Sequence, residues 1–417
     1  MLLAMRLTTD ADPLAVRTMT SGGEEMAFSD PFVSDAQRSE AGRETVADRM
    51  RTLLPANRRR GAAAYAAGRL PDGEEMVRVW LPREAAELSA RLGEAQQVLW
   101  AEDDVLHVLW RGEAEQVLLG GGLQVPMWPV DGAAGLWEAS VRVRRLDEAV
   151  ITVMVIGLGA ADLPFGRGIP DVMTWRGSLA PALPAERPLA GEVRSHTLEA
   201  AALRGPREVT VYVPPDAGGP LPGCLLADGQ SVSSFARVLE PAIAAGAAPP
   251  VVLVGVHSAA GNVDRVDLRS QEYLPQHRPR RFAAHLSFVI DEVIPWAVSS
   301  LPVAEGERWI AGGFSNGAAW ALGAAQRRPE VFGGVAAFSA GVVPKRLTPE
   351  SRTVRHYLAA GALEEGFRRA TLELAARLRR AGVPCHHHEW PGGHDPFWWD
   401  RSLPDALAWL LADSLDS

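Results

Sequence analysis

From about residue 190 onward, short apolar runs alternate with stretches of helix length, and this alternation limits the fold more than any other feature. The runs GCLLADG, VVLVGVHS, RWIAGGFS and VFGGVAAFSAG end in Gly, Asp or Ser, and helix-length stretches such as NGAAWALGAAQRRP lie between them. Two further runs, EVRSHTLEAAAL and REVTVYVPP, are expected to open this region as a pair of strands. The alternation predicts an α/β domain over 191–417, with a mostly parallel sheet and helices on both faces. Functional sites in such sheets form beyond the carboxyl ends of the strands.

The preceding region has a different pattern. Over 71–175, runs such as MVRVWLP, DVLHVLWRG and AVITVMVIGL recur between Gly, Asp and Pro, which predicts a β-sandwich domain. The Pro- and Ala-rich stretch 176–190 is expected to be a linker. Residues 1–70 are weakly patterned, and a helix from about Asp35 to Leu54 and partial disorder are both compatible with them.

Composition excludes several classes of protein. The 417 residues are 47% hydrophobic and 22% charged, as in ordinary globular domains. With 42 basic and 51 acidic residues the net charge is −9, which argues against a nucleic-acid or anionic-membrane partner. Cys224 and Cys385 lie in apolar runs and are expected to be buried thiols rather than a disulfide framework. The chain shows no export signal and no long uninterrupted apolar stretch, so we expect a soluble, cytoplasmic protein without a membrane-spanning helix.

The motif GFSNG at 313–317 is the sharpest chemical signal. It follows the apolar run RWIA and precedes an Ala-rich helix-length stretch. A nucleophile elbow needs this arrangement, because the serine sits at a strained strand-to-helix corner and glycines two residues before and after it relieve crowding. The helix N-terminus also favours developing negative charge. Ser315 is therefore the predicted nucleophile.

A serine nucleophile needs a base, and His394 is the best placed of the ten histidines. It lies in the Gly-rich turn PGGHD, after the run VPCHHHEW and before the last helix-length stretch. That is a loop at the carboxyl end of a strand, where a base could reach the serine hydroxyl. His386, His387 and His388 alternate faces on a strand and have no carboxylate or cysteine at ligand spacing, so we expect no metal there.

The acid is expected between the serine and the histidine. The run YLAAGALEE at 357–365 predicts a strand that ends in a Gly loop, with a carboxylate three residues past the glycine. Glu364 is the leading candidate for orienting the imidazole and Glu365 is the alternative. Asp395 adjoins the histidine and is expected to point elsewhere, and a dyad without an acid stays open.

An oxyanion needs two N–H donors aimed at one point. One is expected from Asn316, the residue after the nucleophile, and the other from Gln230 in the loop that follows the run LLADG. Gly229 in that loop would let the backbone approach the substrate. Asp228 would then fix the loop rather than react.

These residues belong to a series of motifs that occurs in the same order in a known family. The chain resembles the esterase-D-type branch of the α/β-hydrolases, and most closely the enterochelin (ferric enterobactin) esterases. HVLWRGEAEQVLLGGG and PMWPVDGAAGLWEASV also resemble the early-set immunoglobulin-like domain that precedes the hydrolase domain in that family, so the resemblance covers about 75–417. Ala227 departs from the family's usual apolar residue, a change in packing more than in chemistry. The motifs are ADGQ at 227–230, RSQEYLP at 269–275, GFSNG at 313–317, Gly361 with Glu364, and GGHD at 392–395 followed by Trp398.

The resemblance implies a function and assigns roles. Ser315 would be the nucleophile, His394 the base and Glu364 the acid, with oxyanion donors at Gln230 and Asn316. The implied reaction is hydrolysis, through an acyl-enzyme, of the ester bonds in the trilactone backbone of a catecholate siderophore such as ferric enterobactin, which releases iron. The substrate is a small molecule, and the resemblance implies no cofactor.

The substrate class sets expectations for the pocket. A ferric tris-catecholate carries a net −3 charge and flat rings, so guanidinium groups and aromatic faces would suit it. Arg269 is the leading candidate for binding it, and a structural pairing of Arg269 with Glu272 is an equal alternative. Trp398 and Trp399 follow the base and are candidates for the pocket wall, whereas Trp320 is expected in the core.

The sequence is also compatible with other functions. The same branch includes feruloyl and acetyl esterases that act on carbohydrate esters, although such enzymes are usually exported. Acyl transfer to an alcohol and non-catalytic ligand binding are weaker alternatives. The sequence leaves open which siderophore is cut, how many of its esters, whether iron must be bound, what the N-terminal domain does, and whether the chain forms a homo-oligomer.

Overall fold

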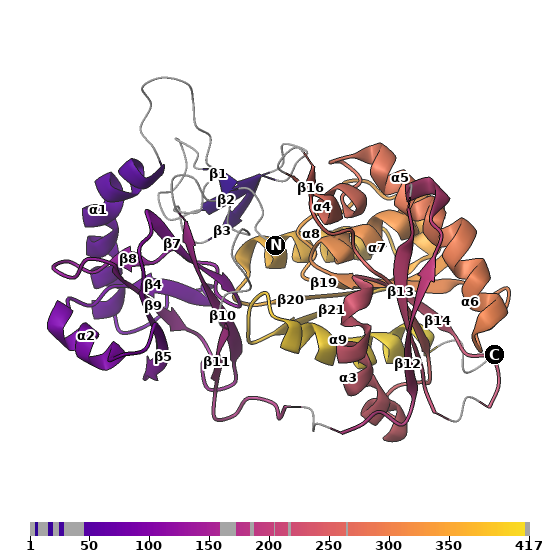
Figure 1. The fold of residues 1–417 in the computed structure, drawn as a ribbon, viewed down its shortest axis with the longest axis horizontal. Helices are drawn as coiled ribbons and strands as arrows, with labels where there is room; N and C mark the ends of the chain where they lie inside the picture. The colour runs from indigo at the N-terminus through magenta and orange to yellow at the C-terminus, as the bar shows by residue number, and fades with distance from the viewer. Residues whose placement is uncertain are drawn as a thin grey trace. The chain divides into compact units, whose positions relative to one another are not determined.

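The computed structural model describes residues 46–158, 172–183, 187–203, 205–215, 218–263 and 266–412, together with the short antiparallel strands β1 (Met5–Arg6), β2 (Val16–Met19) and β3 (Glu25–Phe28) (Figure 1). The chain forms two compact units. The first, here called the β unit, comprises Met1–Pro181 and two later loops, Gly361–Gly366 and Trp390–Asp395. The second, the α/β unit, comprises Ala182–Ala360, Phe367–Glu389 and Pro396–Ser417.

The β unit contains two antiparallel sheets and two helices. Helix α1 (Val46–Ala66) begins later than the expected helix over 35–54, whose first residues lie outside the described part of the chain. The second helix is α2 (Ala85–Leu92). One sheet has the order β4-β9-β6-β5, with β8 also paired to β9, and the other has the order β11-β10-β7. The strands are β4 (Met76–Val79), β5 (Gln97–Glu102), β6 (Val105–Arg111), β7 (Gln116–Gly121), β8 (Trp128–Pro129), β9 (Leu136–Val143), β10 (Val150–Leu158) and β11 (Val172–Arg176).

Alternation along the strands builds the core of the β unit. On β6, Leu106 and Val108 point into a cluster shared with Val117 of β7 and Val153 of β10, so the two sheets pack face to face. Leu109 points the other way, into a smaller cluster under α2. The two-residue period of a strand puts successive side chains on opposite faces, and β6 therefore contributes to both clusters.

An eight-stranded sheet forms the centre of the α/β unit, with the order β12-β13-β15-β14-β18-β19-β20-β21. The expected opening pair of strands is present as β12 and β13; the two are antiparallel, and β13 is also antiparallel to β15. From β15 to β20 each neighbouring pair is parallel. The strands are β12 (Glu192–Leu198), β13 (Arg207–Val213), β14 (Gly223–Ala227), β15 (Val252–Val256), β18 (Trp309–Phe314), β19 (Phe332–Phe338), β20 (Arg355–Gly361) and β21 (Cys385–Trp390); a separate small hairpin joins β16 (Asn262–Val263) and β17 (Val266–Asp267).

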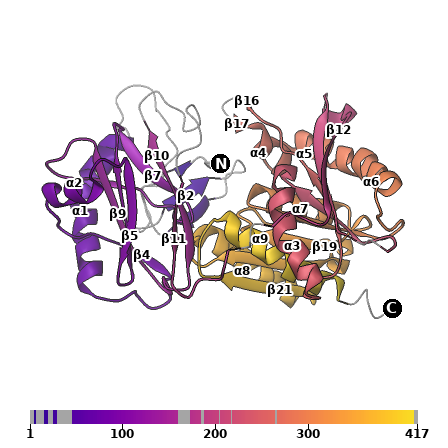
Figure 2. The ribbon, with the colours of Figure 1, turned by 60° about the horizontal axis from the view of Figure 1, so that its bottom comes forward.

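Helices cover both faces of this sheet, and the predicted fold class is confirmed. On one face α3 (Val232–Ala244) lies beside α9 (Pro396–Leu411), as both ribbon views show (Figures 1 and 2). The other face carries the helices that line the main cluster described below. They are α4 (Leu268–Tyr273), α5 (Pro279–Ser287), the π-helical turn η3 (Phe288–Val293), α6 (Ile294–Ser300), α7 (Asn316–Arg327) and α8 (Glu365–Arg380); short 3-10 turns are η1 (Ala201–Leu203), η2 (Gly229–Ser231) and η4 (Glu350–Thr353).

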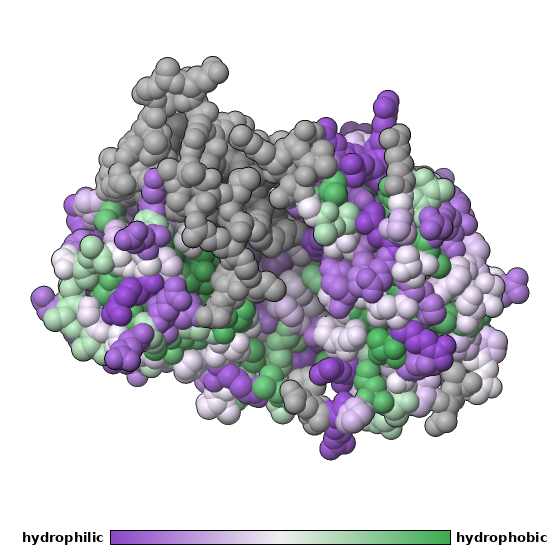
Figure 3. Space-filling model, viewed as in Figure 1, coloured by the Kyte–Doolittle hydropathy of each residue, from purple (hydrophilic) through white to green (hydrophobic). Residues whose placement is uncertain are grey.

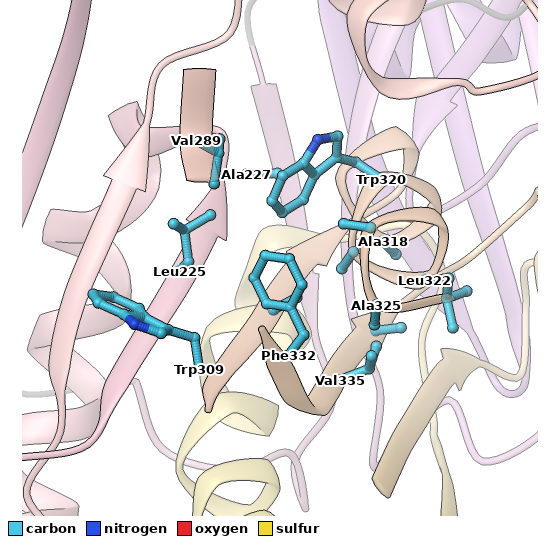
Figure 4. Close-up of a cluster of buried hydrophobic side chains, with 14 of the residues drawn as sticks. Leu225, Ala227, Val289, Trp309, Ala318, Trp320, Leu322, Ala325, Phe332 and Val335 are labelled. Atoms are coloured by element: carbon cyan, nitrogen blue, oxygen red, sulfur yellow. The ribbon is translucent and has the colours of Figure 1, made fainter. Parts of the chain in front are cut away.

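Trp320 anchors the main core of the α/β unit, as predicted. It is fully buried on α7, where its ring meets Phe332 of β19 edge to face. Figure 4 shows both rings in one cluster with Leu225 and Ala227 of β14. Burying a large aromatic ring against aliphatic side chains is worth a few kcal/mol, so this cluster fixes α7 firmly on the sheet.

The continuous helical stretch Pro279–Ser300 is long and apolar enough to cross a membrane by length and composition alone, and it is the one such helix in the part of the chain that the structure describes. Its apolar side chains, among them Phe282, Val289 and Ala297, lie in the main core of the α/β unit.

The described surface is mixed in character. Its exposed large apolar side chains are Tyr65, Val172, Leu179, Leu183 and Leu372. Figure 3 shows hydrophilic and hydrophobic residues interspersed over the visible coloured surface.

Candidate active site

Ser315 lies at the corner between β18 and α7, where the motif predicts a nucleophile elbow. Its φ is 57° and its ψ is −124°, a conformation that costs a non-glycine residue about 1–3 kcal/mol. The backbone N–H of Ser315 donates to the carbonyl of Phe338 at 2.8 Å, which ties the corner to β19. The strand, the strained serine and the helix are therefore all present in the predicted order.

The glycines of the motif are required by close backbone approach. A Cβ on Gly313 would lie 2.7 Å from the carbonyl carbon of Gly317. A Cβ on Gly317 would lie 3.0 Å from Asp228 Oδ2 and 3.1 Å from the Cβ of Ala227. Gly313 therefore excludes a larger residue and Gly317 leaves little room for one, so the elbow packs tightly on itself and on the end of β14.

The loop after β14 carries the second predicted oxyanion donor. Asp228 has a left-handed backbone (φ 61°, ψ 60°) and leads into the turn η2, which contains Gln230. Asn316 is the first residue of α7, and N–H groups in the first turn of a helix have no intrahelical acceptor. Gly229 also has a packing role, and the expected approach of substrate to its backbone stays a prediction. Its added Cβ would lie 2.1 Å from the carbonyl oxygen of Gly255, so the missing side chain serves the packing of this loop on β15.

Asp228 fixes this loop, as expected. Its carboxylate, 1% exposed, accepts a bidentate pair from Arg269, with Nε at 2.6 Å from Oδ1 and a terminal nitrogen at 2.5 Å from Oδ2. Its backbone N–H donates to the hydroxyl of Tyr273 at 3.0 Å. Burial lowers the pKa of the Arg269 guanidinium, but the adjacent Asp228 carboxylate outweighs burial and the pKa is raised. Burial together with this carboxylate holds the pKa of Tyr273 well above its usual value, so the phenol stays a neutral hydrogen-bond partner.

The suggested pairing of Arg269 with Glu272 is wrong. Glu272 accepts from Arg207 of β13 at 2.8 Å instead. Both acids are almost completely buried, and each is paired with a different guanidinium, which compensates its charge. Contact of Arg269 with a substrate stays a prediction, and its observed partner belongs to the loop with Gln230.

A third polar contact near the elbow was not predicted. The side-chain amide of Asn316 donates to Ser270 Oγ at 2.8 Å, and both side chains are buried. Ser270 in turn donates to the carboxylate of Asp267, the N-cap of α4, through its backbone N–H at 2.7 Å and its hydroxyl at 2.6 Å. The signal was present in the motif RSQEYLP, but a sequence does not say which distant amide a serine will meet.

Glu364 and His394 lie on the two later loops of the β unit, and they are in contact. His394 Nδ1 is 2.7 Å from Glu364 Oε2. The other carboxylate oxygen, Oε1, accepts from the backbone N–H of Gly361 at 2.6 Å. With its carboxylate on Nδ1, Glu364 directs Nε2 of the imidazole away from itself. The expected contact between His394 and a glutamate is therefore present, and it is Glu364 rather than Glu365, the first residue of α8, that makes it.

Asp395 points elsewhere, as expected, and its partner was not predicted. Its Oδ2 accepts from the backbone N–H of Thr152 on β10 at 2.6 Å. The two residues are 243 positions apart in the sequence, so no local pattern could indicate the contact.

The tryptophans after the base are buried. Trp399 stacks on Phe314 with the ring centroids 4.3 Å apart and donates from Nε1 to Ser339 Oγ at 2.8 Å. It therefore packs against the residue that precedes the elbow serine. Trp398 is 7% exposed and meets Phe397 edge to face, and its contact with substrate stays a prediction.

The remaining candidates lie away from these contacts. His386 and His388 are exposed and His387 is half-buried, so they alternate along β21 as expected. Cys224 is buried and Cys385 half-buried, both as free thiols, and burial raises the pKa of each.

Comparison with known proteins identifies the family. A model of the Esterase family, described as "Putative esterase", matches residues 200–410, half of the chain. The chain belongs to this family. It is a carboxylic ester hydrolase. A comparison with curated protein sequences gives no significant match.

Solved structures agree in fold. The enterobactin esterase of Shigella flexneri, crystallised in the presence of enterobactin, is 18% identical with a TM-score of 0.55, over 78% of this chain and 98% of its own. The ferric enterobactin esterase of Salmonella typhimurium is 17% identical with a TM-score of 0.56, over 79% of this chain and 100% of its own. At this level of identity the likeness establishes the shared fold, a β domain followed by an α/β-hydrolase domain.

Proposed function

We propose that this esterase works through Ser315 as nucleophile, His394 as general base and Glu364 as the acid that orients the base. The observation that carries the proposal is that the backbone of Ser315 and the surroundings of His394 each have the geometry that a Ser–His–acid mechanism requires. Ser315 has the strained backbone of an elbow, and His394 Nδ1 is held at 2.7 Å by a carboxylate that is 1% exposed. Each is what the Ser–His–acid mechanism requires of its member.

The order of the sheet supports bringing the three residues together. β18 ends next to Ser315, β20 ends at Gly361 before Glu364, and β21 ends at Trp390 before His394. The strands β18, β19 and β20 are parallel to one another. Hydrogen bonds from His356 N to Pro384 O and from Ala362 N to Trp390 O continue the parallel direction to β21. The carboxyl ends of parallel strands meet at one edge, so the three loops start from the same edge of the sheet.

The chemistry follows from these roles. His394 Nε2 takes the proton of the Ser315 hydroxyl as its oxygen attacks an ester carbonyl. The N–H groups of Gln230 and Asn316 then stabilise the oxyanion, and the protonated imidazole gives its proton to the leaving alcohol. Water activated by the same imidazole hydrolyses the acyl-enzyme and returns Ser315 to its starting state.

For the substrate we propose the trilactone backbone of a ferric catecholate siderophore, whose cleavage would release iron. The support is the shared two-domain fold. One of the similar esterases was crystallised with enterobactin and again with 2,3-di-hydroxy-N-benzoyl-serine, a catecholate fragment. The motif series in this chain resembles the same group of enzymes.

The test replaces Ser315 with alanine and measures ester hydrolysis and labelling by a fluorophosphonate. We expect Ser315→Ala to lower kcat by about 10⁴–10⁶-fold and to abolish labelling, while the unfolding midpoint changes little. Ser351→Ala is the control, because Ser351 is as buried as Ser315, at 3%, but lies in η4. Turnover that survives in Ser315→Ala would refute the nucleophile.

The substrate is tested separately, by mass spectrometry of products after incubation with ferric enterobactin and with a feruloylated sugar. Release of linear trimers, dimers or monomers of dihydroxybenzoyl-serine supports the siderophore assignment. Faster cleavage of the feruloylated sugar would replace it with a carbohydrate esterase and would leave the catalytic residues unchanged.

A further inference from the structure

The β ladder between β7 and β10 is interrupted where it meets the histidine loop. Val153 pairs with Gly121, so a continued antiparallel register would pair Thr152 with Gly122. One half of that pair forms, because the Gly122 N–H donates to the Thr152 carbonyl at 2.6 Å. The other half is replaced, because the Thr152 N–H donates to Oδ2 of Asp395 at 2.6 Å. The carboxylate next to the candidate base therefore takes the place of a backbone carbonyl in the sheet.

The backbone of Gly122 meets the histidine loop directly. A Cβ on Gly393 would lie 1.9 Å from the Gly122 carbonyl oxygen and 2.7 Å from its carbonyl carbon. No side chain fits between these two backbones. Gly393 immediately precedes His394, so contacts on both sides of the base, at Gly393 and Asp395, reach the same pair of residues, Gly122 and Thr152.

The acid loop is anchored in the same unit. Leu363, next to Glu364, is 3% exposed and belongs to the apolar cluster between the two β sheets. The backbone N–H of Leu363 donates to the Gly392 carbonyl at 2.9 Å, which joins the acid loop to the histidine loop. Trp390 Nε1 donates to the Gly393 carbonyl at 3.2 Å and closes the histidine loop on itself.

We propose that the two β sheets of the β unit hold the histidine loop and the acid loop of the same unit, and with them the proposed base and acid, in their working positions. In this proposal Asp395 is a positioning residue that acts through its bond to Thr152. A buried carboxylate that accepts from a strand N–H is a short and directional anchor. It fixes the chain one residue after the imidazole, while Gly393 fixes it one residue before. The inference rests on the proposed function, since it takes His394 as the base and Glu364 as its partner.

The test uses the full chain and compares two substitutions of Asp395. Asp395→Ala removes the acceptor, and we expect kcat on p-nitrophenyl butyrate to fall about 10–100-fold with KM changed less than about twofold, because a displacement near 1 Å at the chemistry costs about that much. Asp395→Asn keeps an acceptor oxygen without the charge, and we expect it to retain kcat within about threefold. The rate of fluorophosphonate labelling of Ser315 should follow kcat.

A second pair of variants tests the backbone contact. Gly393→Ala forces its new Cβ against Gly122, and we expect a similar loss of kcat. Gly120→Ala on β7 is the matched control, because the nearest atom to its Cβ would be the flexible end of Ile156 at 3.0 Å and the next contacts, both with Met154, are at ordinary distances of 3.6 and 3.9 Å. These variants also decide the question if Asp395→Ala does not fold.

The outcomes separate this inference from the proposed function. If the wild-type chain shows no turnover and no labelling that depend on Ser315, the proposed function itself is refuted. A second outcome is that turnover depends on Ser315, but Asp395→Ala and Gly393→Ala keep full kcat and only lower the unfolding midpoint. The contacts of the two β sheets with the histidine loop would then contribute to stability alone, and the positioning role would be refuted. Equal losses in Asp395→Ala and Asp395→Asn would assign the effect to the charge and would also overturn it.

Discussion

Removing the guanidinium of Arg269 tests whether the loop after β14, which carries the proposed oxyanion donor Gln230, depends on a buried ion pair. Arg269→Met removes the charge and keeps most of the apolar stem. It leaves the Asp228 carboxylate, 1% exposed, without its bidentate partner at 2.5 and 2.6 Å. Breaking a buried pair by removing one member costs about 3–5 kcal/mol, because an uncompensated charge stays buried. For a domain of 150–250 residues this lowers the unfolding midpoint by about 6–20 °C.

The assay is thermal and urea unfolding followed by far-UV circular dichroism, with a double-mutant cycle. Asp228→Asn suits the left-handed backbone at that position, and combined with Arg269→Met it removes both charges. We expect the double variant to recover at least about 2 kcal/mol relative to additivity. Arg328→Met is the control, since its pair with Glu330 is exposed and should contribute less than about 1 kcal/mol.

Two results would refute this reasoning. One is a loss below about 1 kcal/mol in Arg269→Met, and the other is a double variant that is no more stable than the sum of its parts. Activity assays then separate the two roles considered for this arginine. A structural role lowers kcat for neutral and anionic esters alike, whereas direct binding raises KM for the ferric catecholate alone.

Two further predictions concern other buried titratable groups. Glu364→Gln should lower kcat about 10³–10⁴-fold because it removes the charge that orients the base, whereas Glu365→Gln at the start of α8 should leave kcat within about twofold; equal effects in steady-state assays would reject the assignment of Glu364. In the β domain, burial raises the pKa of Glu138 to about 7 and lowers the pKa of His107 to about 4. Acidification from pH 7 to 5 therefore stabilises the fold through Glu138, which gains its proton more readily folded than unfolded, and destabilises it through His107, which gains its proton more readily unfolded. Each effect is worth about 3 kcal/mol when complete. Glu138→Gln should therefore make the β unit less stable at pH 5 than at pH 7, and His107→Gln should make it more stable at pH 5 than at pH 7. Melting curves with the same pH dependence in both variants would contradict this reasoning.

The sequence predicts those parts of the candidate site that depend on local sterics. The elbow could be identified because a strand, two glycines and a helix in that order leave one backbone path, and the structure has it at Ser315. The contact between Glu364 and His394 could be anticipated because both follow Gly-containing loops at the ends of strands that were themselves recognisable.

The pairing of polar groups across the fold could not be predicted in the same way. Arg269 has an acid three residues away and another 41 residues away, and only the packed structure selects the distant Asp228. The contact between Thr152 and Asp395 is harder to predict. The Thr152 N–H needs an acceptor because the ladder between β7 and β10 is interrupted there, and the sequence does not show where β7 ends because that end consists of consecutive glycines. Long-range selection of this kind depends on which backbone groups remain unpaired after the sheets form.

The order in which the segments of the β unit are synthesised has a consequence for folding during translation. Most of this unit, up to Pro181, is synthesised first, but its last two pieces end at Gly366 and Asp395. At 5–20 residues per second, translation takes roughly 10–40 seconds to cover the interval from Pro181 to Asp395. Throughout that delay the nascent sandwich lacks the leucine that fills its core and the carboxylate that completes its ladder. We expect hydrolytic competence to arise only after Asp395 has been made, so that a translation product that stops before this residue carries an assembled scaffold and no working esterase.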